Sequence, residues 1–216
     1  MPKSDIGSGS QRYNQNKIRM TYLPPALINN LIVLCEAEET NLPIIGLAKL
    51  AEHFSLGSAK YPDGPSTSGF TFPNWAKGQL FDAMLLNSTL RHYYAYLGGE
   101  EYDSDFGSHH LIAVAWGVAC LHHQFTNYDV YSKFDDRMWV NFSVESVEDN
   151  ILSNLNIIQV EFNERICAYL ATCVCLASLK QFEKDTLAEL TFTMDIDRLQ
   201  KIQNTNYGKP VEVKTN

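Results

Sequence analysis

The amino-acid sequence predicts an all-α (mainly α) protein: a helical bundle with a long loop after its second helix and a helical extension toward the C-terminus. Apolar residues recur at helical spacing in several segments, and Pro or Gly residues stand where those segments would begin or end. Only residues 156–162 and 189–194 could be short strands instead. With 216 residues, 45% of them hydrophobic, the chain can bury a sizeable core.

The first two predicted helices both follow prolines. The first begins at Pro24-Pro25 and closes in the glutamate-rich residues 36–39, whereas the second begins at Pro43. We expect Gly57 to end the second helix, because glycine commonly terminates helices. The apolar positions at helical spacing in these two segments are Leu27, Ile28, Leu31, Ile32, Leu34, Cys35, Ile44, Leu47, Leu50, Ala51 and Phe54.

The segment 57–75 is predicted to be a loop, since it holds three prolines and three glycines among polar residues. A loop of this length inside a compact domain is usually functional or disordered. Lys60, Tyr61, Asn74 and Trp75 are costly residues for a simple spacer. Their presence favours a functional loop.

The third predicted helix covers about residues 77–97 and ends at Gly98-Gly99. An acidic turn follows, and the next helix covers about residues 108–125. Residues 126–142 look irregular, and residues 143–203 are again mostly helical. The predicted organisation has three parts: a mobile N-terminal tail, a helical domain and a helical C-terminal extension that could be an oligomer interface, with bounds 1–17, 18–142 and 143–216.

Charge and composition limit the function. The formal net charge of −8 makes a long nucleic acid an unfavourable partner, although one small anion can still bind if a cation screens the charge. No apolar run is long enough to span a bilayer, and the N-terminal residues lack the apolar stretch of a signal peptide. We therefore expect no membrane partner and a cytoplasmic location. Five cysteines, an odd number, argue against a disulfide framework.

The densest polar cluster lies between Arg91 and His110. Two helices joined by a short turn pack antiparallel, so Arg91 and His92 should come close to His109 and His110. The turn between them carries four carboxylates, which repel one another unless a cation lies among them. Oxygen ligands of this kind suit Mg²⁺ or Mn²⁺. The four carboxylates are Glu100, Glu101, Asp103 and Asp105.

Structural explanations compete with this interpretation. An acidic turn is often only solvated, Arg91 could form a surface ion pair, and His92 could be a core histidine with satisfied hydrogen bonds. The run "DSDFG" fails as a calcium loop, because the closing Glu position holds Val114. The tyrosines at positions 93, 94 and 96 could stack a base but more often pack in a core. The pair His122-His123 is interpreted as a partly exposed helix end.

Taken in order, these residues resemble the phage-borne dATP/dGTP diphosphohydrolase-like family. The resemblance covers about residues 18–140. The matching elements are Leu23 to Pro25, Gly57 to Tyr61, Asn74-Trp75, Asn87 with Arg91-His92, Gly99 to Asp103, Gly107 to His110, and Asp135 to Arg137. The Asn-Trp pair comes later than usual, because residues 64–73 lengthen the loop. Two positions that are often His and Asn in the family are Ala113 and Gly117 here, which removes polar groups from the His110 side of the helix.

The resemblance implies an all-helical nucleotide pyrophosphohydrolase, similar to MazG-type enzymes. Such enzymes cleave a nucleoside triphosphate to the monophosphate and pyrophosphate with Mg²⁺. Glu100 and Asp103 would hold Mg²⁺ (or Mn²⁺), and His92 or His110 would orient or deprotonate water. Arg91 and Lys60 would neutralise the leaving pyrophosphate. The proposed base contacts are stacking by Tyr61 and Trp75 and hydrogen bonding by Asn74 or Asn87.

Two other functions stay open. The site could sequester a signalling or modified nucleotide without hydrolysing it, as a phage anti-defence protein would, because Ala113 and Gly117 would enlarge the pocket and remove polar groups. The chain could also be a helical interaction protein with a decayed site. The resemblance further implies a homo-oligomer, a dimer or tetramer, and the host cytoplasm as the location if the chain is phage-encoded.

Overall fold

The computed structural model describes residues 18, 20–61, 64–65, 71–105, 107–137, 150–161 and 163–206. It confirms the all-α fold, with seven α-helices. Among the described residues, the only strands are β1 (Gly64–Pro65) and β2 (Thr71–Phe72), a two-residue antiparallel pair. The tail predicted for residues 1–17 lies outside the described residues, as do residues 138–149.

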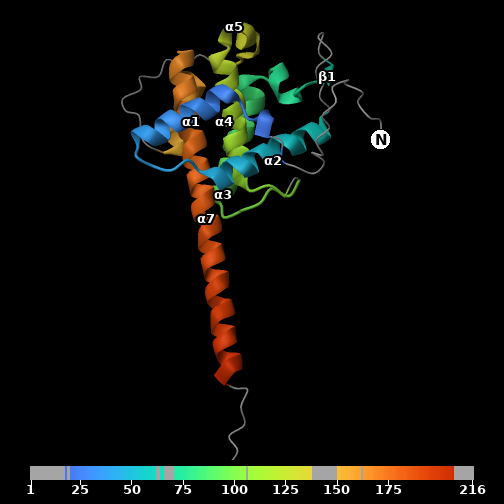
Figure 1. Cartoon of the computed structure of the whole chain (residues 1–216). Helices are drawn as coiled ribbons and strands as arrows, with labels where there is room; N and C mark the ends of the chain where they lie inside the picture. The colour runs from blue at the N-terminus through green and yellow to red at the C-terminus, as the bar shows by residue number, and fades with distance from the viewer. Residues whose placement is uncertain are drawn as a thin grey trace, which may run out of the picture.

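The first four helices follow the predicted order with shifted ends (Figure 1). The expectation that residues 126–142 are irregular was wrong in part, because a short α-helix covers Tyr128–Tyr131 and a 3-10 turn covers Ser132–Phe134. The seven α-helices are α1 (Pro25–Ala37), α2 (Ile44–Lys60), α3 (Asn87–Leu97), α4 (His110–Thr126), α5 (Tyr128–Tyr131), α6 (Ile151–Val160) and α7 (Glu164–Asn206). Short 3-10 turns lie at Met20–Tyr22 (η1), Asn74–Lys77 (η2) and Ser132–Phe134 (η4), and a π-helical turn covers Phe81–Leu86 (η3).

Two predicted helix ends were wrong. Gly57 does not end α2, which continues to Lys60. Its end is set by Tyr61, whose φ of −122° and ψ of 95° are extended, as expected for a residue that precedes a proline. The third helix begins at Phe81 rather than Lys77, because Gly78 has a φ of 96° and interrupts the backbone before η3 and α3.

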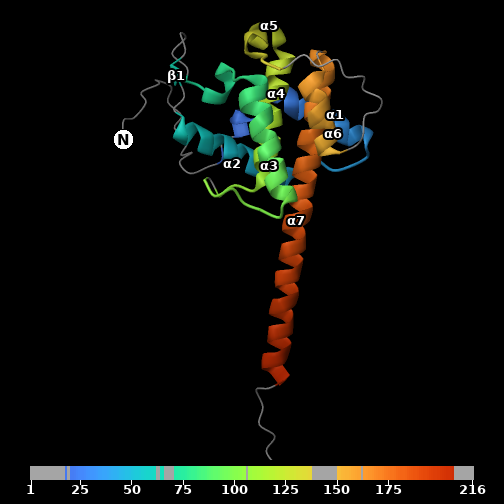
Figure 2. The ribbon, with the colours of Figure 1, turned by 180° about the vertical axis from the view of Figure 1, so that it is seen from behind.

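Helix α4 is the centre of the molecule (Figures 1 and 2), and nearly all of its residues are buried. Its closest partner is the first half of α7, which contributes an apolar side to the same core. Residues on both sides of position 142 therefore share one hydrophobic core. The buried apolar residues from α6 and α7 are Ile151, Leu155, Ile157, Ile158, Cys167, Ala168, Leu170, Ala171, Val174, Cys175, Leu176, Leu179 and Phe182.

Helix α7 is continuous over 43 residues, and its C-terminal part extends away from the other helices in both views (Figures 1 and 2). Of the two stretches that could have been strands, residues 156–160 and 189–194 are helical, and Glu161 is an extended residue that follows α6. Within the described residues, Glu164–Ala188 is long and apolar enough to cross a membrane by length and composition alone. Because 61% of the apolar window is buried inside the protein, the core accounts for most of this hydropathy.

Candidate functional site

Helices α3 and α4 place the two predicted catalytic imidazoles side by side. His92 lies on α3 and His110 is the first residue of α4, and their Nδ1 atoms are 3.0 Å apart. One of these nitrogens must donate a hydrogen to the other, so the two rings adopt opposite tautomers at this contact. His110 is only 3% exposed, whereas His92 is half-buried. The predicted approach of the two helices is present at this pair.

The acidic turn between α3 and α4 is closed by backbone hydrogen bonds, although most of its described residues are exposed to solvent. The amide of Asp103 donates to the carbonyl of Ser108 (2.8 Å), and the amide of Gly107 donates to the carbonyl of Asp103 (2.7 Å). The amide of His110 donates to the carbonyl of Glu101 (2.9 Å). Gly107 has a φ of 63°, which side-chain-bearing residues rarely adopt. These bonds hold the turn against the start of α4.

Two carboxylates of the turn face histidines of α4. Glu100 Oε1 lies 3.6 Å from His110 Nε2, and Glu101 Oε1 lies 3.9 Å from His109 Nε2. Both distances are too long for a hydrogen bond. His109 has a capping role, because its Nδ1 accepts a hydrogen bond from the amide of Leu111. His110 Nε2 is buried and has no hydrogen-bond partner within the described residues.

A third imidazole, which the sequence analysis missed, joins this group from α2. His53 Nδ1 lies 2.9 Å from the hydroxyl Oγ of Ser108, the residue that closes the acidic turn. Its ring lies 5.8 Å from the ring of Trp116. His53 also interacts electrostatically with His92 and Asp103. Helices α2 and α3 and the start of α4 thus each bring one imidazole to the acidic turn.

Burial keeps His53 and His92 neutral near neutral pH. Desolvation lowers the pKa of His53 to about 4, and the neighbouring His92 adds to this effect, while Asp103 opposes it. Desolvation also lowers the pKa of His92; Asp103 and Glu100 oppose that shift, and His110 and Arg91 reinforce it. A neutral imidazole can accept a proton, which is what a general base requires.

Other predicted site residues lie at the surface. The Arg91 side chain is exposed, and its Nη2 donates to the hydroxyl of Ser88 (3.2 Å). Asn87 is exposed one helical turn before it. At the end of α2, Lys60 Nζ lies 5.7 Å from the centre of the Tyr61 ring, and both residues are exposed. Arg91 adjoins His92 in the chain, and its positive charge helps to lower the pKa of His92.

Asn74 and Trp75 belong to η2 rather than to an open loop. Asn74 Oδ1 accepts a hydrogen bond from Lys77 Nζ (3.1 Å). Trp75 packs with ring centroids 5.1 Å from Phe54 and 5.1 Å from His123, so much of its surface serves the core. His122, interpreted from sequence as part of an exposed helix end, is fully buried. The sequence interpretation of His122 was wrong because the Asn30 side of α1 covers α4 there.

Gly117 does not enlarge the site, contrary to the sequence-based expectation. A Cβ atom at this position would lie 2.0 Å from Oγ1 of Thr89 on α3. The side chain of Thr89 therefore fills the space, and the glycine allows α3 and α4 to approach closely. Ala113 is likewise buried, at 3% exposure. The residues at these positions serve helix packing.

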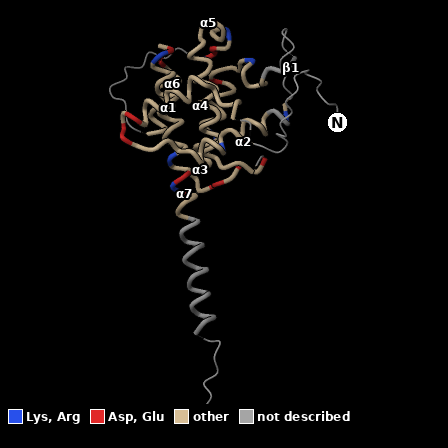
Figure 3. Tube along the Cα trace, in the orientation of Figure 1, with Lys and Arg blue, Asp and Glu red and all other residues tan. Residues whose placement is uncertain are grey.

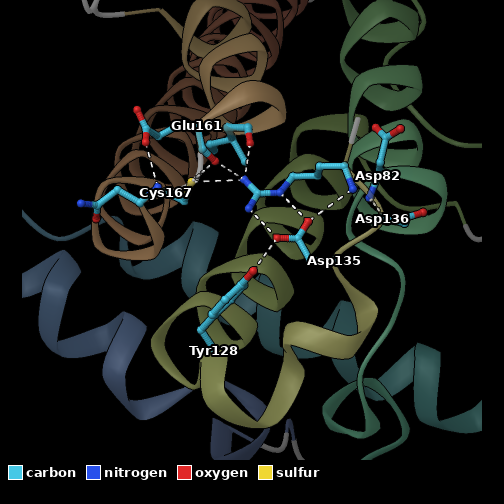
Figure 4. A network of polar contacts seen from close by, with 9 residues as sticks. Asp82, Tyr128, Asp135, Asp136, Glu161 and Cys167 are labelled. Atoms are coloured by element: carbon cyan, nitrogen blue, oxygen red, sulfur yellow. Dashed lines mark hydrogen bonds and ion pairs between the residues drawn. The ribbon is translucent and has the colours of Figure 1, made fainter. Parts of the chain in front are cut away.

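The segment Asp135–Arg137 forms a separate buried network (Figure 4). Arg137 makes two hydrogen bonds with the Asp135 carboxylate, at 2.8 and 2.7 Å, and donates to the carbonyls of Ile158 and Glu161. Burial raises the pKa of the Asp135 carboxyl, but the bonds and charge of Arg137 outweigh this and hold it below its usual value. This network joins the end of α5 and η4 to the α6–α7 corner.

Asp136 in the same segment supports the site indirectly. Its carboxylate accepts hydrogen bonds from the amides of Asp82 (2.7 Å) and Ala83 (3.1 Å) at the start of η3. These amides lack partners within the helix, so the carboxylate caps them. Because η3 leads directly into α3, Asp136 helps to set where α3 begins. All three residues of the predicted Asp-Asp-Arg element are therefore structural.

A shallow depression of about 380 Å³ adjoins the acidic turn. It lies between the end of α3, the turn and α7. On the Cα trace of Figure 3, acidic residues mark the turn, and both acidic and basic residues mark the adjacent part of α7. Glu100 lines the depression and also faces His110, so this carboxylate lies between the depression and the imidazole pair, which does not itself line the depression. Its lining residues are Tyr96, Gly99, Glu100, Glu101, Asp185 and Ala188.

A protein-family model described as dATP/dGTP diphosphohydrolase, N-terminal, matches residues 8–137. The chain belongs to this family. The matched segment contains all three imidazoles, the acidic turn and residues Asp135–Arg137. No curated protein and no solved structure matches the chain. Family membership indicates nucleoside triphosphate hydrolysis as the type of activity.

The match to the family model ends at Arg137, but this residue packs against elements that follow it in the chain. Its guanidinium donates to carbonyls of α6 and the α6–α7 corner and contacts Cys167 Sγ on α7 (3.4 Å). Side chains of α7 also pack on α4, which carries His110. Helices outside the matched segment therefore complete the core that supports the candidate site.

Proposed function

We propose that the protein hydrolyses (deoxy)nucleoside triphosphates to the monophosphate and pyrophosphate, with Mg²⁺ or Mn²⁺. The observation that carries the proposal is the His92–His110 pair next to Glu100 and Asp103, inside the segment that matches the family. The neutral, half-buried His92, the buried His110 and the adjacent carboxylates combine proton acceptors with oxygen ligands. Hydrolysis of a phosphoanhydride needs both.

The donor set fits a divalent cation that binds together with its nucleotide. Among the described residues, no group of three or more His, Cys, Asp or Glu side chains is placed to hold a metal ion by itself. Glu100 and Asp103 are two carboxylates that both act on His92. Mg²⁺ keeps several waters and is usually held by one or two carboxylates together with substrate phosphates. When bound, the ion neutralises phosphate charge and polarises the phosphorus.

The imidazoles would move the proton in this reaction. A water oxygen forms a bond to phosphorus, the bond to the pyrophosphate oxygen breaks, and His92 or His110 takes the proton of the water. His110 Nε2 is a suitable atom for this role, because it is buried, has no hydrogen-bond partner among the described residues and faces Glu100. The proton can then pass to the leaving group or to solvent.

The remaining proposed contacts hold the nucleotide. Arg91 and Lys60 are exposed cations that would neutralise the leaving pyrophosphate. Tyr61, 53% exposed, offers a free ring face for the base, and Asn74 and Asn87 offer amides for its edge. Trp75 can contribute only the part of its ring that Phe54 and His123 leave uncovered. These roles support a nucleotide as the ligand.

The proposal extends to assembly and location. We propose a homo-oligomer, a dimer or tetramer, in the cytoplasm. Helix α7 carries apolar side chains that are largely exposed in the single chain, among them Tyr169 (56%) and Leu187 (51%). Light scattering coupled to size exclusion tests the oligomer, and a monomeric mass at micromolar concentration contradicts it.

The test of hydrolysis is a panel of deoxynucleoside and nucleoside triphosphates with Mg²⁺ or Mn²⁺, assayed for pyrophosphate and monophosphate. We expect turnover with wild type and a loss of roughly 100-fold or more for His110→Asn, as for removal of a general base. The absence of turnover with every nucleotide, metal and pH contradicts the proposal. In that case, nucleotide released intact from denatured protein would indicate sequestration instead.

A further inference from the structure

We propose that His53 is a positioning residue of the site: through the Ser108 hydroxyl it holds the acidic turn so that Asp103 and Glu100 face the bound cation. This inference depends on the proposed function, because it assigns His53 to the same metal–nucleotide site. It adds a residue from α2 that the predicted motifs of the turn and its two helices do not contain.

The first step of the argument is the path from His53 to Asp103. His53 Nδ1 is 2.9 Å from Ser108 Oγ. The carbonyl of the same Ser108 accepts a hydrogen bond from the amide of Asp103 (2.8 Å). One residue therefore links the α2 imidazole to the backbone that carries the carboxylate. A shift of Ser108 moves Asp103 directly.

The second step concerns how firmly His53 is held. Its ring is half-buried and lies against Trp116 of α4, with 5.8 Å between ring centroids. Trp116 in turn packs near Phe54, which neighbours His53 on α2 and is only 1% exposed. The imidazole is thus fixed by the core on one side and presents Nδ1 to the turn on the other. A fixed partner of this kind can orient a ligand residue.

The third step separates positioning from packing. If His53 served only to fill space, an aromatic ring of similar shape would replace it. If its Nδ1 atom matters, asparagine should replace it better than phenylalanine, because the Asn amide can place a polar atom near the position of Nδ1. The contact between His53 Nδ1 and Ser108 Oγ can also be removed from the other side, by Ser108→Ala.

The experiment measures Mn²⁺ binding by electron paramagnetic resonance, with and without a non-hydrolysable nucleoside triphosphate, and in parallel the Mg²⁺ dependence of turnover. The variants are His53→Phe, His53→Asn, Ser108→Ala and the double variant His53→Phe/Ser108→Ala. We expect His53→Phe and Ser108→Ala each to weaken Mn²⁺ binding roughly tenfold, as residues that orient metal ligands do. The Mn²⁺ affinity of the double variant should be no lower than that of the single variant with the lower affinity. The reason is that His53→Phe and Ser108→Ala remove the same contact. His53→Asn should recover most of the affinity.

The matched control is Ser55→Ala. Ser55 is also on α2, but its hydroxyl donates to the carbonyl of Ala51 within the helix (3.0 Å). This variant should bind Mn²⁺ as wild type does. Circular dichroism melts of all variants identify any that lose the fold, and Ser108→Ala, a small change in a half-buried side chain, keeps the test informative if His53→Phe does not fold.

The possible results separate the two proposals. Additive losses in the double variant, equal affinity of the Phe and Asn variants, or wild type that binds no Mn²⁺ with or without nucleotide would each overturn the role of His53. If wild type binds Mn²⁺ and the predicted pattern holds but no nucleotide is hydrolysed, the role of His53 stands and hydrolysis fails. If wild type hydrolyses nucleotide but the losses of Mn²⁺ affinity are additive, hydrolysis stands and the role of His53 fails.

Discussion

Two polar centres of the molecule differ in how completely their hydrogen bonds are made. Around Arg137, every nitrogen of the guanidinium has a partner, and the side chain has no exposed surface. At the imidazole pair, His110 Nε2 has no partner within the described residues, and the nearest carboxylate oxygen is 3.6 Å away. Arg137 and His110 are both buried, at 4% and 3% exposure, so burial alone does not explain the difference in their hydrogen bonding.

The contrast teaches what each centre is built for. A fully paired buried ion holds neighbouring elements in one arrangement, and removing either partner is costly. A buried polar atom without a partner is unfavourable in the free protein and gains most when a ligand or water reaches it. The Arg137 centre should therefore affect stability, and the His110 centre should affect binding and turnover. Each prediction below tests one side of this contrast.

The largest effect on stability is expected for Arg137→Met. This change leaves Asp135 buried without its cation and leaves the carbonyls of Ile158 and Glu161 without their donor. Breaking a buried pair on one side costs about 3–5 kcal/mol, which urea unfolding measures. Lys133→Met, an exposed cation nearby, is the control and should change the unfolding free energy by less than about 0.5 kcal/mol. Equal effects of the two variants would contradict the structural role of Arg137.

The next effect is a loss of stability at acid pH from His122. Desolvation first, and the neighbouring His123 second, lower the pKa of His122 from 6.5 to about 4. The neutral ring is favoured in the folded state, so its contribution is complete above pH 6.5 and is lost as the pH falls toward 4. The loss is on the order of 2–3 kcal/mol.

Urea midpoints at several pH values between 7 and 4 measure this loss, and His122→Gln should flatten the dependence. His122 sharpens the comparison, because its Nδ1 also lacks a partner among the described residues. Its Nε2 lies 2.9 Å from Nδ2 of Asn30, and its charged neighbour is another histidine rather than a carboxylate. An unpaired imidazole nitrogen therefore indicates a site only where carboxylates stand beside it. A pH dependence that His122→Gln leaves intact would assign it to other groups.

A smaller effect is expected for Gly117→Ala. The added Cβ would lie 2.0 Å from Thr89 Oγ1, so α3 and α4 must move apart. Overpacking of this kind costs about 1–3 kcal/mol. It also separates His92 from His110, so turnover should fall with stability. Thr89→Ala in the same chain should recover part of both, whereas Gly57→Ala, where the added atom meets nothing within 4 Å among the described residues, should not destabilise.

The sequence was sufficient for the helices and for half of the site. Helical spacing and the Gly98-Gly99 stop predicted that α3 and α4 would meet, which brings His92 to His110. The exact ends of helices depended on single residues, such as the extended Tyr61 before a proline and Gly78 with its positive φ. A glycine in the sequence does not by itself show where a helix ends, because glycine is tolerated inside helices as well as after them.

The parts that could not be predicted depend on contacts between distant segments. His53 lies in a helix far before the acidic turn, and only the packing of α2 on α4 brings it to Ser108. A signal was present, since His53 directly precedes Phe54 at the edge of an apolar stripe, but many surface histidines look the same. The role of Arg137 was hidden for the same reason, because its partners are backbone carbonyls near α6 and α7.

The smallest effect on stability, with a large effect on function, is expected for Glu100→Gln. The Glu100 side chain is 58% exposed and makes no hydrogen bond to His110 at 3.6 Å, so the unfolding free energy should change by less than about 0.5 kcal/mol. Turnover and Mn²⁺ affinity should nevertheless fall about tenfold or more, since the change removes a proposed ligand charge.

Glu101→Gln is the matched control: its carboxylate is 41% exposed and faces His109, whose Nδ1 caps α4. If the two variants lose activity equally, the turn acts only through its total charge. If only Glu100→Gln does, the imidazole with the unpaired nitrogen and its facing carboxylate form the reactive side of the molecule, in contrast to the fully paired Arg137.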